Sequence, residues 1–144
     1  MINDQISIKG ALKITKNGEV VREIDNLVVD MGKTLVASRI GSNTDNFVNY
    51  MGLGISGWSP VVAGDTALVA EVGRSAAVSS TSISNPLDVV FTATFSAGVA
   101  SGSITEAGLF NAASGGTLVA RTAFAVVNKG PDDIVTITWT VTIS

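Results

Sequence analysis

Apolar and polar residues alternate along the first thirty residues, as they do in the two strands of a half-buried β-hairpin. The apolar positions of the first segment share one parity and are Ile6, Ile8, Leu12 and Ile14. The Asn17–Gly18 pair then suits a two-residue turn of type I′, which needs positive φ at both central residues. A valine-rich extended pattern resumes from Val20 to Val29, so the sequence predicts a hairpin over residues 5–29.

A short helix is predicted directly after the hairpin, over residues 31–40. Asp30 precedes this segment and is placed to cap its N-terminus. Met31, Leu35 and Ile40 fall roughly on one side of the helix, and Gly41 closes it.

The remaining chain reads as short strands about ten residues apart, with turn signals between them. Strands are predicted over residues 47–55, 74–84, 89–95, 104–111, 117–127 and 135–143. One helical turn, capped by Asp65, is predicted over residues 66–71. This pattern predicts an all-β fold, an antiparallel β-sandwich or jelly roll with one short α-helix, in a single domain spanning residues 1–144.

The strand over residues 135–143 has the clearest alternation in the chain. Its apolar positions are Val135, Ile137, Trp139, Val141 and Ile143, and four threonines lie between them. One face of the strand is therefore expected to be buried, and the other is a row of threonines. Two interpretations of the threonine face stay open, exposure to solvent and pairing with the sheet of another protomer.

The composition excludes several classes of function. The chain has no cysteine, so it forms no disulfide or thiolate metal site, and no histidine, which removes most proton-transfer chemistry. Nine basic and twelve acidic residues give a net charge of −3 and a pI near 4.7, which argues against nucleic acid as a partner. We also expect neither a membrane-spanning segment nor a secretory signal, because no apolar stretch has the required length.

The low charge of the chain points to contact with other proteins. Only 15% of the residues are charged, where soluble chains average about 25%, and the mean hydropathy is +0.43. A surface with so few charges is poorly protected against association. We therefore expect much of it to be covered by neighbouring subunits.

Sequence signals for catalysis are weak or lack their context. Gly52, Gly54 and Gly57 have the G-x-G-x-x-G spacing of dinucleotide-binding loops, but Trp58 and Pro60 follow where a helix would have to begin. No carboxylate pair is placed for glycoside hydrolysis, and no run has the spacing of a calcium loop. We predict that the protein is not an enzyme and that it has no catalytic residue, cofactor or metal.

The candidates for interaction or framework roles are Trp58, Glu71, Arg74, Glu106 and Arg121. Trp58 lies in a Gly/Pro loop, where it either docks into a neighbouring subunit or folds back over the core. The four charged residues have apolar surroundings, in which a buried charge needs a partner. They form inter-strand or inter-subunit ion pairs, or else occupy ordinary solvent-facing strand positions.

Two segments carry a resemblance to a known family. The sequence GDTALVAEVGR starts at Gly64, and ITEAGLFNAASGGTLVARTAF starts at Ile104 and precedes the last alternating strand. They resemble small virion structural proteins of tailed bacteriophages and, more loosely, the N-terminal domain of phage tail-collar fibre proteins. In that family a G-D-x-x-L-x-x-E-x-x-R stretch precedes a strand bearing T-E-x-G-L-F and a glycine turn. The matching part runs from about Tyr50 to the end of the sequence.

The resemblance implies a β-rich module that decorates or joins parts of a virion, assembled in the host cytoplasm. The leading hypothesis is a capsid decoration or cement protein that stabilises the head by bridging neighbouring capsid subunits. Its partners would be the major capsid protein and further copies of itself, as a homotrimer or homodimer, with no nucleic acid and no membrane. A fibre would continue into a shaft, whereas this sequence ends at Ser144.

Two alternatives to a head protein stay open. The first is a tail component, namely a collar, baseplate or fibre-attachment adaptor protein, with tail proteins as its partners. The second is a soluble binding module unrelated to virions.

Overall fold

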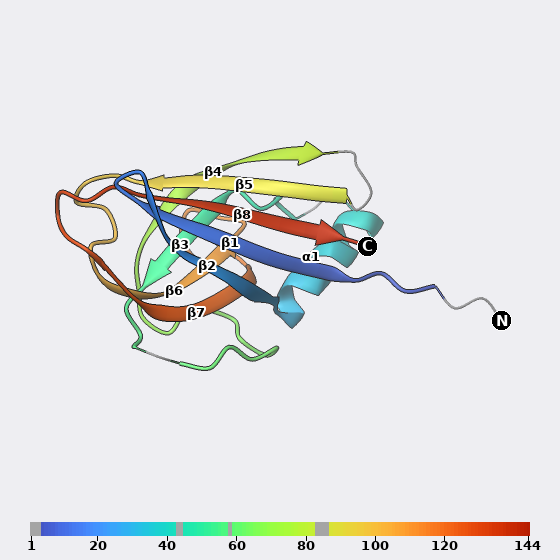
Figure 1. Cartoon of the computed structure of the whole chain (residues 1–144). Coiled ribbons are helices and arrows are strands. Elements are labelled where there is room, and N and C mark those ends of the chain that lie inside the picture. The colour runs from blue at the N-terminus through green and yellow to red at the C-terminus, as the bar shows by residue number, and fades with distance from the viewer. Residues whose placement is uncertain (1–3, 43–44, 58, 83–86) are drawn as a thin grey trace.

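The computed structural model describes residues 4–42, 45–57, 59–82 and 87–144, and Figure 1 shows their arrangement. In this part of the chain there are eight strands and one helix. The elements are β1 (Ile8–Lys16), β2 (Glu19–Val28), α1 (Asp30–Gly41), β3 (Tyr50–Gly54), β4 (Glu71–Ser82), β5 (Leu87–Phe95), β6 (Gly102–Phe110), β7 (Leu118–Lys129) and β8 (Val135–Ile143). The protein is therefore all-β with one short helix, as the residue pattern predicts.

The strands close into an antiparallel barrel in the order β1-β2-β7-β6-β3-β4-β5-β8. Strand β2 pairs with β1 through residues 19–26 and with β7 at Leu27 and Val28. Strand β4 likewise pairs first with β3 and then, from Ala77 onward, with β5. Closure differs from the predicted sandwich or jelly roll, in which two sheets face each other. Alternation within a strand is the same in both architectures, so it does not reveal which strands bend across to join the sheets.

The β1–β2 hairpin turns at Asn17 and Gly18. Their φ angles are 51° and 87°, the positive values that a type I′ turn requires. The Asn17 side chain also reaches the connection before β8, because its Nδ2 donates to Asp133 Oδ1 at 2.8 Å and its Oδ1 accepts from the Ile134 N–H at 2.9 Å. Two turns therefore hydrogen-bond to each other at this end of the barrel.

Apolar side chains from every strand fill the barrel interior. Strand β8 contributes Val135, Ile137 and Trp139, none of which is more than 2% exposed. The Trp139 Nε1 also donates to Asn26 Oδ1 at 2.7 Å. Asn26 lies opposite Gly10, where a Cβ would overlap with the Asn26 side chain, so the glycine provides the space in which this hydrogen bond forms.

Helix α1 lies at the other end of the barrel from the hairpin turn and packs against β7 (Figure 1). Its buried residues are Gly32 and Leu35, whereas Met31 and Ile40 are exposed. Of the three residues that fall roughly on one side of the helix, Leu35 is therefore buried and the other two are not. At Gly32 a Cβ would overlap with the backbone oxygen of Val119, so close packing of one turn on β7 decides which side is buried.

The helix begins without the predicted Asp30 cap. Its N-cap residue is Val29, which makes no side-chain hydrogen bond, and Asp30 lies inside the first turn. The Asp30 N–H donates instead to the backbone oxygen of Ala63 at 2.8 Å. A neighbouring loop thus satisfies one of the N-terminal donors that have no partner within the helix.

A second and smaller apolar cluster lies beneath the connection from β3 to β4. The described part of this connection, residues 55–57 and 59–70, is called the strap. Leu68 of the strap packs with Val29, Phe110 and Leu118, and Tyr50 lies at the edge of the cluster. The helical turn predicted over residues 66–71 does not form: residues 66–70 are not helical, Glu71 begins β4, and the N–H groups of Val69 and Ala70 donate to Glu106 instead.

Candidate functional site

Glu106 and Arg121 lie on the outer face of the barrel wall, on the neighbouring strands β6 and β7. Ala107 and Leu109 point into the barrel core, so Glu106 and Gly108 point outward. Arg121 lies opposite Gly108 in the ladder and shares its face. Alternation alone would place both charges in solvent, yet Glu106 is 0% and Arg121 1% exposed. They are buried because the strap covers this part of the wall.

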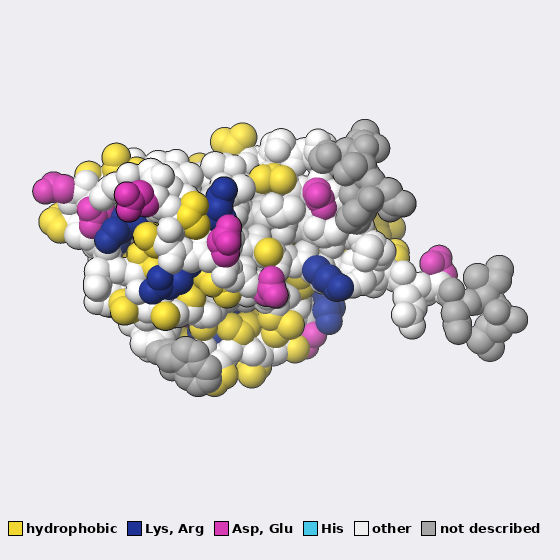
Figure 2. Space-filling model, viewed as in Figure 1, with side chains coloured by type: hydrophobic (Ala, Val, Ile, Leu, Met, Phe, Trp, Pro, Cys, Tyr) yellow, Lys and Arg dark blue, Asp and Glu magenta, His cyan; other side chains and the backbone are white. Residues whose placement is uncertain are grey.

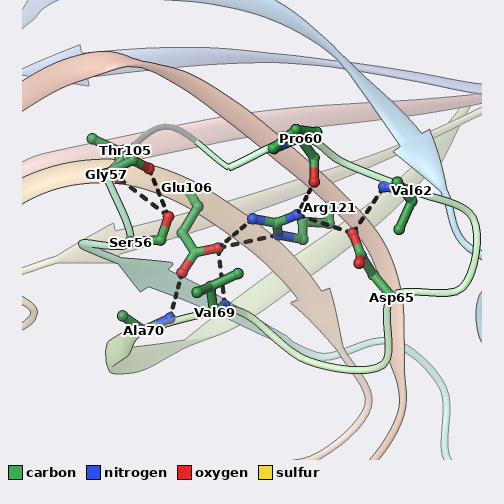
Figure 3. A network of polar contacts seen from close by, with 10 residues as sticks. All are labelled: Ser56, Gly57, Pro60, Val62, Asp65, Val69, Ala70, Thr105, Glu106 and Arg121. Atoms are coloured by element: carbon green, nitrogen blue, oxygen red, sulfur yellow. Dashed lines mark hydrogen bonds and ion pairs between the residues drawn. The ribbon is translucent and has the colours of Figure 1, made fainter.

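The two residues form an ion pair beneath the strap (Figure 3). Arg121 Nε and Nη2 donate to Glu106 Oε2 at 3.1 and 2.9 Å. Arg121 Nη1 donates to Asp65 Oδ2 at 2.9 Å and to the backbone oxygen of Pro60 at 3.1 Å. The guanidinium therefore contacts two carboxylates and a carbonyl, which offsets the free energy of taking its charge out of water.

The same carboxylates hold the main chain of the strap. Glu106 Oε2 and Oε1 accept from the N–H groups of Val69 and Ala70 at 3.1 and 2.8 Å. Asp65 Oδ2 accepts from the Val62 N–H at 3.0 Å. Hydrogen bonds to charged groups contribute about 1.5–3 kcal/mol each. These bonds fix the strap backbone in its middle, at Val62, and at its C-terminal end, at Val69 and Ala70, and the last two use donors that a helical turn would need.

Two glycines of β3 make this arrangement possible. Gly54 lies directly opposite Glu106, and a Cβ there would overlap with the Glu106 carboxylate. A Cβ at Gly52 would lie 3.0 Å from the Phe110 ring and 3.2 Å from Glu71 Oε2. In the structure the first two glycines of GLGISG therefore make room for neighbouring side chains.

A second ion pair joins Glu71 and Arg74 at the start of β4. Arg74 Nε and Nη2 donate to Glu71 Oε2 and Oε1 at 2.6 and 3.1 Å. The Arg74 guanidinium lies over the Phe110 ring, 3.5 Å from its centroid, a cation–π contact. Its Nη1 donates to the backbone oxygens of Ala112 and Gly115 at 2.8 and 2.9 Å. Arg74 thus connects β4 to the turn between β6 and β7.

The structure brings four of the five candidate residues into two ion pairs, Glu106 with Arg121 and Glu71 with Arg74. Trp58 lies outside the described residues. Sequence reasoning missed Asp65 as a partner of Arg121, because an aspartate before an apolar run reads as a helix cap. The signal that could have identified Asp65 is its place in GDTALVAEVGR. In the structure this segment packs against the segment ITEAGLFNAASGGTLVARTAF, which contains Glu106 and Arg121.

The strap carries exposed apolar side chains on this fixed backbone. Val69, Val62 and Ile55 are 61%, 54% and 43% exposed. Asp65 is the one charged residue in the sequence from 55 to 70. In Figure 2 charged side chains lie over β1 and β2, while hydrophobic side chains gather along the lower margin, where Figure 1 shows the strap. Apolar surface of this kind is typical of protein–protein contacts.

Two further properties bear on what the site can do. Within the described ranges there is no group of three or more acidic side chains that could hold a metal ion. No helix among the same residues has the length and apolar character needed to cross a membrane. The charges described above serve to position a loop, and the surface that the loop offers is apolar.

No family model, curated protein or solved structure matches this chain.

Proposed function

We propose that the protein is a structural virion protein of a tailed bacteriophage, a capsid decoration or cement protein that bridges neighbouring capsid subunits. Two lines of support meet in the same part of the molecule. The segments that resemble phage virion proteins contain Asp65, Glu106 and Arg121, and these three residues hold the strap on the barrel.

The observation that carries the proposal is that a buried ion pair is used to hold an exposed, apolar loop. Glu106 and Arg121 fix the backbone on which Val62 and Val69 face solvent. A loop that is already ordered loses little conformational entropy when it binds, so more of its contact free energy appears as affinity. A preorganised apolar surface is what docking on another subunit requires.

In this proposal the protein acts by mass action. A protein that binds the assembled shell and not its separated subunits stabilises the shell by RT ln(1 + [L]/Kd), about 2.7 kcal/mol per site when its free concentration is about a hundred times Kd. Interfaces of standard size bury about 1,600 Å² in total. Repeated over a shell, such contacts would resist internal pressure without any single strong bond.

The first test is a variant of the strap. Val69→Lys places a charge at a side chain that is 61% exposed, so the fold is retained while the apolar docking surface is disrupted. We expect retention on purified heads to fall at least about tenfold, which corresponds to about 1.4 kcal/mol of binding free energy. Co-sedimentation of the variant with heads that lack the native protein measures this loss.

Val78→Lys is the matched control. Val78 is 76% exposed on β4, in the part of that strand that pairs with β5, away from the strap. The control should bind heads like the native protein and show the same melting temperature as Val69→Lys. Equal binding by both variants, or loss of binding by both, contradicts docking through the strap.

A map of the particle tests the location independently. Copies spread over the icosahedral shell support the cement role. A ring confined to the tail replaces it with the role of a collar, baseplate or adaptor protein. A monodisperse monomer without affinity for any virion protein contradicts both.

A further inference from the structure

The turn between β1 and β2 contains the one Asn–Gly pair of the sequence, Asn17 and Gly18, and both residues are exposed. Asparagine is among the thermolabile residues, because its side-chain amide can be lost. A glycine after asparagine favours this loss, since it has no side chain and its backbone takes many conformations. The surroundings of Gly18 are open, because a Cβ there would meet nothing within 4 Å. The β1–β2 ladder ends at Lys16 opposite Glu19, so Gly18 lies outside it.

Loss of the amide at such a pair is an internal displacement. The Gly18 backbone nitrogen attacks Cγ of Asn17 and forms a C–N bond, while the bond from Cγ to Nδ2 breaks. The proton of the Gly18 N–H leaves with Nδ2 as ammonia, and the product is a succinimide ring. Water then opens the ring at either of its two carbonyl groups, which gives aspartate or isoaspartate at position 17. No oxidant or reductant takes part, so an exposed turn and water supply all that the reaction needs.

The fold holds the Asn17 amide at both of its polar atoms. Nδ2 donates to Asp133 Oδ1 at 2.8 Å, and Oδ1 accepts from the Ile134 N–H at 2.9 Å. The Asp133 carboxylate is fixed in turn, because its Oδ2 accepts from the Gly130 N–H at 2.8 Å. The Asn17 main chain is held as well, since its N–H donates to the backbone oxygen of Ile134 at 2.9 Å.

These contacts oppose ring closure. The Nδ2 atom leaves as ammonia, so the reaction breaks its hydrogen bond with Asp133. An ionised carboxylate only accepts hydrogen bonds, so Asp133 holds the amide nitrogen without supplying the proton with which it leaves. Ring closure also changes the torsion angles between Asn17 and Gly18, which the hairpin holds at the positive φ values of a type I′ turn.

We propose that Asn17 is a deamidation site of this protein, and that Asp133 slows the reaction in the folded state by holding the Asn17 amide nitrogen. The product carries a carboxylate at position 17, where the native amide donates to Asp133. Two like charges then face each other. Deamidation therefore loosens the contact between the hairpin turn and the β7–β8 connection, which lie side by side at one end of the barrel (Figure 1). This inference does not depend on the proposed virion function.

The rate of deamidation tests the role of Asp133. Mass spectrometry of the peptide that contains Asn17 follows the reaction during incubation at mildly alkaline pH. Asp133→Ala should deamidate at least about fivefold faster than the native protein, a factor that corresponds to about 1 kcal/mol, the net contribution of one hydrogen bond. Asp132→Ala is the matched control, because it removes a neighbouring exposed carboxylate from the same connection. This control should deamidate at the native rate.

The same chains unfolded in urea give the rate without protection by the fold. All three should then react equally fast, and the folded native protein should react more slowly than its own unfolded chain. The proposal is overturned if the folded native protein loses the Asn17 amide as fast as the unfolded chain does. Equal rates for folded Asp133→Ala and Asp132→Ala also overturn it.

A further pair of variants tests the consequence of the modification. Asn17→Asp reproduces the aspartate product and should lower the urea midpoint, because it brings two carboxylates together. Asn17→Asp/Asp133→Asn exchanges donor and acceptor, so an amide at position 133 again donates to a carboxylate at position 17. The double variant should recover part of the lost midpoint. A midpoint of Asn17→Asp equal to that of the native protein contradicts the loosening of this contact.

Discussion

The β1–β2 pair and the β6–β7 pair belong to one barrel wall, but they place charge in opposite ways. The first carries seven charged side chains, none of which is buried: Lys9, Lys13, Lys16, Glu19, Arg22, Glu23 and Asp25. The second carries three, each at most 2% exposed: Glu106, Arg121 and Lys129. Both pairs are antiparallel and alternate inward and outward positions, so the difference lies in what covers them.

Whether a charged side chain is exposed or buried decides how much it affects the stability of the fold. Exposed charges such as Lys13 and Glu23 are solvated and contribute little to stability, about 0–1 kcal/mol even when they pair. Glu106 and Arg121 depend on each other, because a buried charge without a partner is strongly unfavourable. The hairpin therefore contributes charge for solubility, and the β6–β7 pair positions the strap.

The largest effect is expected from breaking the buried pair. Arg121→Met leaves the Glu106 carboxylate buried without its partner and releases Asp65 and Pro60, so the free energy of unfolding should fall by about 3–5 kcal/mol. Urea unfolding followed by circular dichroism measures this loss.

Lys13→Met, an equivalent loss of one cation on the exposed hairpin, should change the free energy of unfolding by no more than about 0.5 kcal/mol. Glu106→Gln/Arg121→Met should recover part of the loss, since the uncompensated charge is gone. Similar free energies of unfolding for Arg121→Met and Lys13→Met would mean that coverage by the strap has no energetic consequence.

A smaller effect is expected from removing the space beneath the strap. Gly54→Ala introduces a Cβ that overlaps with Glu106, so the free energy of unfolding should fall by about 1–3 kcal/mol. Gly64→Ala is the matched control, because a Cβ there meets nothing within 4 Å, while both variants change the unfolded chain in the same way. Comparing their urea midpoints checks the prediction, which fails if the control loses as much as Gly54→Ala.

The smallest effect concerns the Asp133 carboxylate, which lies in the connection from β7 to β8 and accepts a hydrogen bond from the hairpin turn. The hydrogen bond from the Asn17 amide, followed by that from the Gly130 N–H, holds the pKa of Asp133 below its ordinary value. A lowered pKa in the folded state stabilises the protein above the unfolded pKa of about 3.9, and this stability is lost as the pH falls through the folded pKa.

Asp133→Asn should therefore be slightly less stable than the native protein at pH 7 and should lose less stability as the pH falls below about 4. Urea unfolding at several pH values from 7 to 2 measures both curves. Parallel curves would show that the Asp133 carboxylate makes no pH-dependent contribution.

Much of the local structure could be predicted from the sequence. The Asn17–Gly18 turn lies where its residue types place it, and the alternation over residues 135–143 identifies the strand whose Trp139 is buried. Such features depend on neighbours in the chain, since a turn type needs particular φ angles and a strand face repeats every second residue.

For the candidate site, the sequence identified individual charged residues but not which of them would contact one another. Glu106 and Arg121 stand out as charges in apolar surroundings, but their alternation fits a solvent-facing position equally well. Residue types near Asp65 in the chain predict a helix cap followed by a helical turn. In the structure Asp65 instead bonds to Arg121, which is 56 residues away. The preference of a short segment for a helical turn is weak compared with a hydrogen bond to a charged side chain from a distant part of the chain.

The sequence by itself determined that this chain folds mainly as β-strands, where most of them lie, and that its charge is too low for a well-solvated surface. Tertiary structure alone decided that the strands close into a barrel, that the strap covers one outer face, and that Glu106 and Arg121 meet beneath it. The reason is physical: strand formation and turn geometry follow from adjacent residues, whereas burial of a charge depends on which distant segment lies over it and what partners that segment brings.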